Sequence, residues 1–214
     1  MPITVYIVDD HRILRDGLRM LLELRGDIRV VGEAEDGRKA LDGILETRPD
    51  VVLMDIAMPE LNGIDATRNI LVKMPRTKVI ILSVHSDAEH IYRAWQAGAK
   101  GYLLKESAGD EVVTAVHAVY NEKQYISQKI SDIIPLNYAR QRQGRSPFEL
   151  LSAREREVLQ LTVEGATSAA IAEKLNLSPK TVDTYRSRLM DKLGIQNLPE
   201  LVRFAIKHGL TPSE

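Results

Sequence analysis

Hydrophobic residues in the first half of the chain follow two alternating spacings. Short runs of strand length, most of them rich in β-branched residues, are separated by stretches that place apolar residues at helical intervals. The strand-length runs are Thr4–Val8, Val30–Glu33, Val51–Met54, Val79–Ser83 and Gly101–Leu104. Strands that alternate with helices predict an α/β fold, here a doubly wound, five-stranded parallel sheet with helices on both faces.

The amino-acid composition changes between residues 123 and 147. Gln, Arg, Asn and Ser dominate this segment, and Gly144-Arg145-Ser146-Pro147 is a breaker sequence. We therefore predict a first domain over residues 1–122, a linker over residues 123–147 and a second domain over residues 148–214. One short helix is expected in the linker, around Ser127–Tyr138.

Beyond the linker every segment has the pattern of a helix, which predicts a small all-α domain. Ser152 and Glu155 have the spacing of a capping box at the start of the first helix. The helices expected after it are Ser168–Leu175, Ser178–Leu193 and Leu198–His208. The second and third are joined by a short turn, and the third carries polar residues outward. This arrangement is typical of a helix-turn-helix.

The composition narrows the class of protein. The chain is 44% hydrophobic and 28% charged, as in ordinary soluble proteins. No apolar run approaches the ~18–20 residues that span a bilayer, and Met1-Pro2-Ile3-Thr4 lacks the pattern of a secretion signal. Because the chain has no Cys, disulfides, thiolate metal sites and a Cys nucleophile are excluded. We therefore expect a cytoplasmic protein that does not bind membranes.

The net charge of −1 conceals an asymmetry along the chain. Residues 1–122 carry a net charge of −5, residues 123–147 carry +4, and residues 148–214 are neutral overall. An acidic first domain beside a basic linker indicates two units with different partners. The neutral second domain does not by its charge alone indicate binding to nucleic acid.

Polar residues follow four of the predicted strands. In strand order they are Asp9 with Asp10, then Asp55, Ser83 and Lys105. Ligands in open parallel sheets bind at the carboxyl ends of the strands, so we expect these side chains to share one crevice. Carboxylates so close together repel unless a cation joins them, and Mg²⁺ prefers oxygen ligands. An Asp carboxylate can also act as a nucleophile and form an aspartyl phosphate.

Motifs in the first domain strengthen this hypothesis. They are Val8-Asp9-Asp10-His11, Asp55-Ile56-Ala57-Met58-Pro59 with Gly63, Ser83, and Gly101-Tyr102-Leu103-Leu104-Lys105. With these motifs, residues 1–122 resemble the receiver domain of response regulators. The resemblance implies that a histidine kinase phosphorylates Asp55 and that Lys105 contacts the phosphoryl group. It further implies Mg²⁺ ligation by Asp9 (mostly through water), Asp10, Asp55 and the carbonyl of Ala57, and a switch formed by Ser83 and Tyr102.

One position departs from the usual receiver pattern. Many receivers have a proline after the lysine, in a cis peptide, whereas here Glu106 follows Lys105. A cis bond before a residue other than proline costs ~3 kcal/mol. The sequence therefore leaves the geometry of this loop open.

The second domain resembles the LuxR-type DNA-binding domain over about residues 148–210. The motifs are Leu151-Ser152-Ala153-Arg154-Glu155-Arg156-Glu157-Val158-Leu159, Ile171-Ala172, Leu177-Ser178-Pro179-Lys180-Thr181-Val182 and Lys192-Leu193-Gly194. A receiver followed by this domain is the organisation of the NarL/FixJ subfamily. The resemblance implies that the chain binds double-stranded promoter DNA, as a homodimer when phosphorylated, and can meet RNA polymerase there. The implied DNA contacts are Lys180, Thr181, Asp183, Thr184, Arg186, Ser187, Arg188 and Lys192.

Three other functions remain open from the sequence. A Mg²⁺-dependent phosphatase or phosphotransferase would use the same Asp nucleophile, but no additional lid segment is evident and the helix-turn-helix would have no role. A flavodoxin-like FMN binder needs a phosphate-binding loop after the first strand, where Asp9 and Asp10 would repel phosphate. A receiver that serves only as a protein-interaction module would not need the complete acidic site. We therefore expect a regulator, not an enzyme that acts on other substrates.

Overall fold

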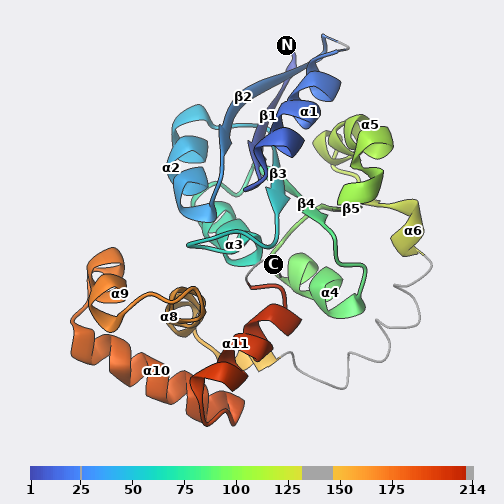
Figure 1. Ribbon diagram of the computed structural model, residues 1–214. Helices are drawn as coiled ribbons and strands as arrows, with labels where there is room; N and C mark the ends of the chain where they lie inside the picture. The colour runs from blue at the N-terminus through green and yellow to red at the C-terminus, as the bar shows by residue number, and fades with distance from the viewer. Residues whose placement is uncertain (25, 132–146, 211–214) are drawn as a thin grey trace.

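The computed structural model describes residues 1–24, 26–131 and 147–210, which form two bodies (Figure 1). The first body contains β1 (Ile3–Val8), α1 (Arg12–Glu23), β2 (Ile28–Ala34), α2 (Gly37–Thr47), β3 (Val51–Asp55), α3 (Gly63–Lys73), β4 (Lys78–Ser83), α4 (Ala88–Gln96), β5 (Gly101–Leu104), α5 (Ala108–Tyr120), β6 (Tyr125–Ile126) and α6 (Gln128–Ser131). The second contains α8 (Ala153–Val163), α9 (Ser168–Leu175), α10 (Pro179–Leu193) and α11 (Leu198–Lys207). Short 3-10 helices, η1 (Lys105–Ser107) and η2 (Pro147–Leu150), follow β5 and precede α8.

The sheet is parallel throughout, with strand order β2-β1-β3-β4-β5-β6. The predicted doubly wound sheet is confirmed, and each of the five expected strands is present. The two-residue strand β6 was not expected, because a segment so short leaves no recognisable period in the sequence. It extends the sheet beyond residue 122, and Ile130 of α6 is fully buried against the first body. Of the helix expected around Ser127–Tyr138, the part after Ser131 lies outside the described residues.

The helices cover both faces of the sheet. One apolar cluster joins the sheet to α2, α3 and α4, and the other joins it to α1 and α5. All five residues of β3 are buried, as a central strand with helices on both sides requires. No helix in the described part of the chain has the length and apolar character needed to cross a membrane.

The second body has the helix boundaries that the sequence indicated. The capping box is present, since the Ser152 hydroxyl accepts a hydrogen bond from the backbone of Glu155 while the Glu155 carboxylate accepts one from the backbone of Ser152. The Ser178 side chain caps α10, and Gly194 ends it in a left-handed conformation. A separate apolar core holds the four helices together.

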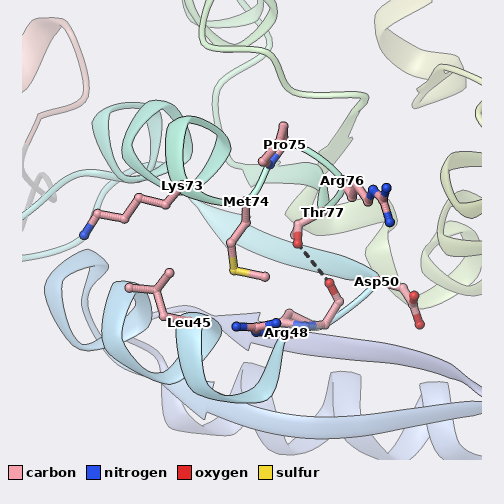
Figure 2. A pocket seen from close by; sticks show the side chains of 9 residues that line it. Leu45, Arg48, Asp50, Lys73, Met74, Pro75, Arg76 and Thr77 are labelled. Atoms are coloured by element: carbon pink, nitrogen blue, oxygen red, sulfur yellow. Dashed lines mark hydrogen bonds between the residues drawn. The ribbon is translucent and has the colours of Figure 1, made fainter.

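The amino ends of β3 and β4 form a pocket of about 480 Å³ (Figure 2). Its lining includes Leu45, Arg48, Lys73, Met74 and Arg76. The Thr77 hydroxyl donates a hydrogen bond of 3.0 Å to the Pro49 carbonyl, which ties together the segments that lead into the two strands. The polar strand ends described above lie at the opposite, carboxyl edge of the sheet.

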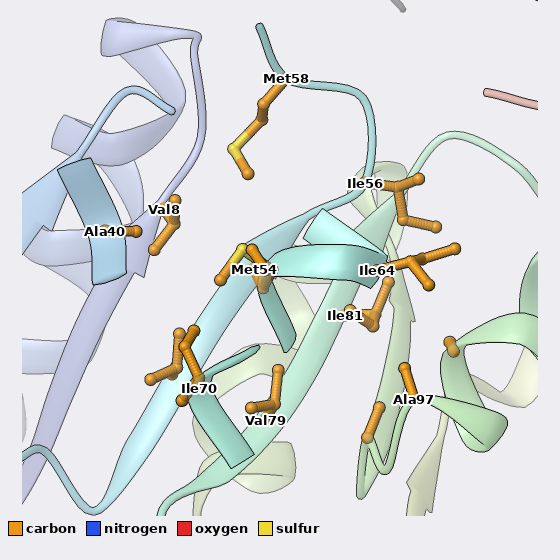
Figure 3. Packing of buried hydrophobic residues seen from close by; sticks show 14 of the residues in the cluster. Val8, Ala40, Met54, Ile56, Met58, Ile64, Ile70, Val79, Ile81 and Ala97 are labelled. Atoms are coloured by element: carbon orange, nitrogen blue, oxygen red, sulfur yellow. The ribbon is translucent and has the colours of Figure 1, made fainter. Parts of the chain in front are cut away.

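The core beneath the carboxyl edge is tightly packed (Figure 3). Met58 and Ile56, from the loop after β3, are buried with Met54 and Ile64 in the same cluster. Gly63 begins α3 directly against β3. A Cβ atom added there would lie 1.8 Å from the carbonyl oxygen of Asp55, so only glycine fits without moving the strand end.

We predict that Gly63→Ala lowers the free energy of unfolding by about 2–3 kcal/mol, because the new methyl group overlaps rigid backbone. Gly17→Ala is the matched control, since its Cβ would meet no atom within 4 Å on the exposed side of α1. The control should raise the free energy of unfolding by up to ~1 kcal/mol through helix propensity. Chemical denaturation measures both, and equal effects of the two substitutions would contradict the prediction.

Candidate functional site

The sheet brings together the charged residues expected at its carboxyl edge. Asp9 and Asp55 are both almost completely buried. The Nζ atom of Lys105 lies 2.8 Å from Asp9 Oδ2 and 2.8 Å from Asp55 Oδ2. Lys105 follows β5 directly, and every peptide bond among the described residues is trans, which answers the geometry that the sequence left open. One ammonium group therefore holds two carboxylates from different strands.

The electrostatics of this cluster are unbalanced. Burial and the nearby carboxylate of Asp9 raise the pKa of Asp55 to about 7, although Lys105 acts in the opposite direction. Burial alone would lower the pKa of Lys105, but the carboxylates of Asp55 and Asp9 outweigh burial and raise it. The acidic site thus holds more negative charge than one lysine neutralises.

The same residues fit a divalent cation. Asp9 Oδ2 and Asp10 Oδ1 are buried, and neither has a well-aligned hydrogen bond within the described residues. The nitrogen atoms beside them are Lys105 Nζ at 2.8 Å and His11 Nδ1 at 2.6 Å. Together with Asp55 they offer the hard oxygen ligands that Mg²⁺ prefers. Ala57 lies two residues beyond Asp55, and the role of its carbonyl stays a prediction.

Two residues that support this cluster were missed in the sequence. Arg15, on α1, is buried and donates a hydrogen bond of 2.7 Å to the backbone carbonyl of Asp9. His11 donates its backbone N–H to Asp9 Oδ1 at 2.9 Å, which orients that carboxylate. An arginine on the buried face of an amphipathic helix was the available signal for Arg15, since burial of an arginine requires a partner.

Ser83 and Tyr102 meet at the loop between β4 and α4. The Ser83 hydroxyl accepts a hydrogen bond of 3.0 Å from the backbone N–H of His85, and the Tyr102 hydroxyl donates one of 2.8 Å to the carbonyl of the same residue. Tyr102 is fully buried, and burial raises its pKa. Both expected switch residues thus bind the backbone of the same residue, His85.

The second body is docked on the loop that leads from β3 to α3. Gln160, a fully buried polar residue of α8, accepts hydrogen bonds from the backbone and side-chain nitrogens of Asn62 at 2.8 and 3.0 Å. Its amide donates one of 2.8 Å to the carbonyl of Met58. Arg156 adds an ion pair of 2.7 Å with Asp65. Sequence reasoning missed this contact, although Gln160 interrupts an apolar stretch of α8.

A second contact between the bodies lies at α4. Arg93 is buried, donates a hydrogen bond of 2.7 Å to the carbonyl of His208 and lies 4.1 Å above the ring of Phe148. The His208 ring pairs with Glu89 at 2.8 Å. The end of α11 is therefore held against the first body, whereas Leu198 and Ile206 on the same helix remain exposed.

The polar face of α10 points to solvent. Of the eight candidate DNA contacts, six are exposed and two, Thr181 and Arg186, are half-buried. A hollow of about 340 Å³ on this face is lined by Ser178, Lys180, Thr181, Thr184, Tyr185 and Arg188. The docked arrangement therefore leaves the expected recognition surface accessible.

Three of the five charged candidates have side-chain partners within the second body. Lys192 lies 2.7 Å from Glu155 of the capping box. Asp183 accepts a hydrogen bond of 2.7 Å from the hydroxyl of Ser168, to which Arg186 donates one of 3.1 Å. To contact DNA, these side chains would have to give up their partners within the domain. Lys180 and Arg188 are the two basic candidates for which the described residues show no such side-chain partner.

Comparison with known proteins identifies both bodies. The family model described as "Response regulator receiver domain" matches residues 5–117, and that described as "Bacterial regulatory proteins, luxR family" matches residues 149–205. The chain is 42% identical to "Response regulator UvrY" of Escherichia coli (strain K12), over 99% of this chain and 97% of the relative. It is 38% identical to "Oxygen regulatory protein NreC" of Staphylococcus epidermidis, over 96% and 98% of the two chains.

Solved structures of response regulators align with nearly the whole chain. The RcsB response regulator of Salmonella typhimurium aligns with a TM-score of 0.60 at 29% identity, covering 95% of this chain and 97% of that one. The structure of an RcsB–DNA complex aligns with a TM-score of 0.60 at 27% identity, covering 97% and 99% of the two chains.

The raised pKa of Asp55 predicts a pH dependence of stability when divalent cations are absent. Because the pKa of Asp55 is higher in the folded state, its protonation adds to the stability of the folded state, and this contribution is complete below pH 3.8, the ordinary pKa. The contribution is lost as the pH rises through about 7. At pH 8 with a chelator, the free energy of unfolding of Asp55→Asn should therefore exceed that of wild type by about 4 kcal/mol. The difference should shrink as the pH falls toward 4, as followed by urea denaturation. A difference that is independent of pH would contradict this explanation.

Proposed function

Because this chain belongs to the two-component response regulators that join a receiver domain to a LuxR-type DNA-binding domain, we propose that phosphorylation of Asp55 controls its binding to promoter DNA. One observation carries the proposal. The same chain presents a buried Asp55 held by Lys105 at one end of the sheet and an exposed polar face on α10. The first is suited to accepting a phosphoryl group and the second to meeting DNA.

The proposed reaction is transfer from the phosphohistidine of a histidine kinase. The bond between phosphorus and the histidine nitrogen breaks, a bond between phosphorus and an Asp55 oxygen forms, and the kinase histidine keeps the electron pair of the broken bond. Asp55 lies at the strand end with its carboxylate oriented by Lys105, whose charge stabilises the transferring group. Mg²⁺, held by Asp9, Asp10, Asp55 and the Ala57 carbonyl, would supply further charge neutralisation. Catalysis by the chain is confined to its own phosphorylation and dephosphorylation.

Ser83 and Tyr102 would change their hydrogen bonds when Asp55 is phosphorylated and so alter the conformation of the loop between β4 and α4. The Ser83 hydroxyl, which accepts a hydrogen bond from His85, can turn to donate one to a phosphoryl oxygen on Asp55. That change removes one of the two hydrogen bonds that hold the backbone of His85. A ligand shifts only an equilibrium between states that it binds differently, and this loop provides such a difference beside α4.

Release of the docked domain is the expected consequence. Both docking contacts involve elements next to the acidic site, namely the loop from β3 to α3 and helix α4. A released pair of domains can place two α10 helices in successive major grooves, and two linked modules bind more tightly than one. We assign the exposed Leu198 and Ile206 of α11 to the contact between the two copies.

On DNA, α10 would lie in the major groove. Asp183, Thr184 and Ser187 would face the base edges, while Lys180, Thr181, Arg186, Arg188 and Lys192 would contact phosphates or bases. The bound dimer would then act on transcription by RNA polymerase in the cytoplasm.

Phosphorylation is tested by intact mass after incubation with a small phosphodonor and Mg²⁺. Wild type should gain the mass of one phosphoryl group, and Asp55→Ala should gain none because it lacks the accepting carboxylate. A DNA-binding titration of the same samples should show several-fold tighter binding for phosphorylated wild type alone. Addition of the phosphoryl group to Asp55→Ala, or no adduct on either protein with any donor, would overturn the assignment of Asp55.

We also predict that Gln160→Ala weakens the docking of the second domain by about 1–3 kcal/mol, because it leaves buried groups of Asn62 and Met58 without partners. The radius of gyration of the unphosphorylated chain in solution should increase. Arg154→Ala is the matched control on the same helix, since the partners of Arg154 among the described residues, Glu157 and Leu175, belong to its own domain. An unchanged radius for Gln160→Ala, or an equal increase for the control, would show that Gln160 does not hold the domains together.

A further inference from the structure

The chain that follows α11 packs against the start of α4 (Figure 1). His85, in the loop before α4, and His90, in the first turn of that helix, stack their rings with centroids 4.2 Å apart and planes 7° from parallel. Asp87 accepts a hydrogen bond of 2.6 Å from Nδ1 of His90 and so fixes that ring, which belongs to a residue only 2% exposed. The loop and the helix are therefore joined by a pair of stacked rings.

Gly209 of the second body lies directly against these two rings. A Cβ atom built on it would lie 2.5 Å from His90 Nε2 and 3.3 Å from His85 Nε2, so the position has room for glycine and not for a side chain. Its φ of +62° also favours glycine. The backbone of the DNA-binding domain is thus packed on the ring pair of the receiver.

The chain on each side of Gly209 is held in place. The carbonyl of His208 accepts a hydrogen bond of 2.7 Å from the buried Arg93, and the His208 ring pairs with Glu89 at 2.8 Å. Leu210 is fully buried in the core of the second body. Gly209 can therefore leave the two rings only if the end of α11 leaves α4 with it.

The backbone of His85 is held at the same time by both switch residues. Its N–H donates a hydrogen bond of 3.0 Å to the Ser83 hydroxyl, and its carbonyl accepts one of 2.8 Å from the Tyr102 hydroxyl. His85 thus binds the switch through its backbone and the second body through its ring. A Ser83 hydroxyl that turned toward a phosphoryl group would free the His85 N–H, and the ring could then shift against Gly209.

We propose that the packing of Gly209 on the His85–His90 ring pair holds Ser83 and Tyr102 in their unphosphorylated arrangement. The docked domain then weakens the binding of a phosphoryl group at Asp55, and a phosphoryl group weakens the dock. Two binding equilibria that share one contact affect each other by the same factor. This inference rests on the proposed function, since it assigns the regulation of the same site, and it makes His85 a positioning residue.

The test is the affinity of the full-length chain for beryllofluoride, a non-covalent mimic of the phosphoryl group, with Mg²⁺ present and the bound fraction measured by fluorine NMR. Gly209→Ala should bind it about fivefold more tightly than wild type, because the added methyl group displaces the end of α11 from the rings. Gly194→Ala is the matched control and should bind as wild type does. Gly194 has a similar φ of +66° at the end of α10, but a Cβ atom there would meet no atom within 4 Å.

A second variant separates the proposed coupling from a general loosening of the fold. His85→Ala removes the ring and keeps both backbone hydrogen bonds to the switch residues. In that background Gly209→Ala should change the affinity by less than about twofold, because the two substitutions act on one contact.

Three results would overturn the coupling while leaving Asp55 as the phosphoacceptor. They are equal affinities of Gly209→Ala and wild type, equal tightening by Gly194→Ala, and an undiminished effect of Gly209→Ala in the His85→Ala background. No binding of beryllofluoride by any of these proteins, wild type included, would overturn the proposed function and the coupling together.

Discussion

The structure depends on one ammonium group that holds two buried carboxylates. Lys105 reaches Asp9 and Asp55 from the far side of β3 and β4, and it is the only interaction of opposite charge that the described residues give to Asp55. Without Lys105, both carboxylates would be buried with no compensating charge. The parallel sheet is what makes the arrangement possible, because it directs every strand end to one edge. The resulting surplus of negative charge is the property that suits the site to a cation.

The loop from β3 to α3 connects the acidic site to the contact between the two domains. Gly63 lets α3 begin against the Asp55 carbonyl, and Asn62, just before it, caps α3 and binds Gln160 of the second domain. Few residues separate Asp55 from the docking contact, so a small movement of this loop reaches the DNA-binding domain directly. The half-buried and buried groups of α4 provide a second, independent connection.

Much of this could be read from the sequence because the signals are local or periodic. The period of the apolar residues predicted the sheet and its helices, and caps such as Ser152 and Ser178 set the helix starts within a residue. The acidic site followed from the strand order alone, since residues that end parallel strands must meet. Strand β6 could not be predicted, because two residues have no period and only pairing with β5 defines them.

The sequence by itself therefore determined the two folds, the residues at the carboxyl edge and the polar face of α10, because each is set by short-range spacing and by strand direction. Only the tertiary structure decided which distant groups became partners. Arg15 with the Asp9 carbonyl, Gln160 with Asn62, and His90 facing Gly209 join residues whose separation along the chain carries no periodic signal. Such pairs arise when packed surfaces bring buried polar groups together, and their hydrogen bonds are satisfied, or left open, only by the final arrangement of the domains.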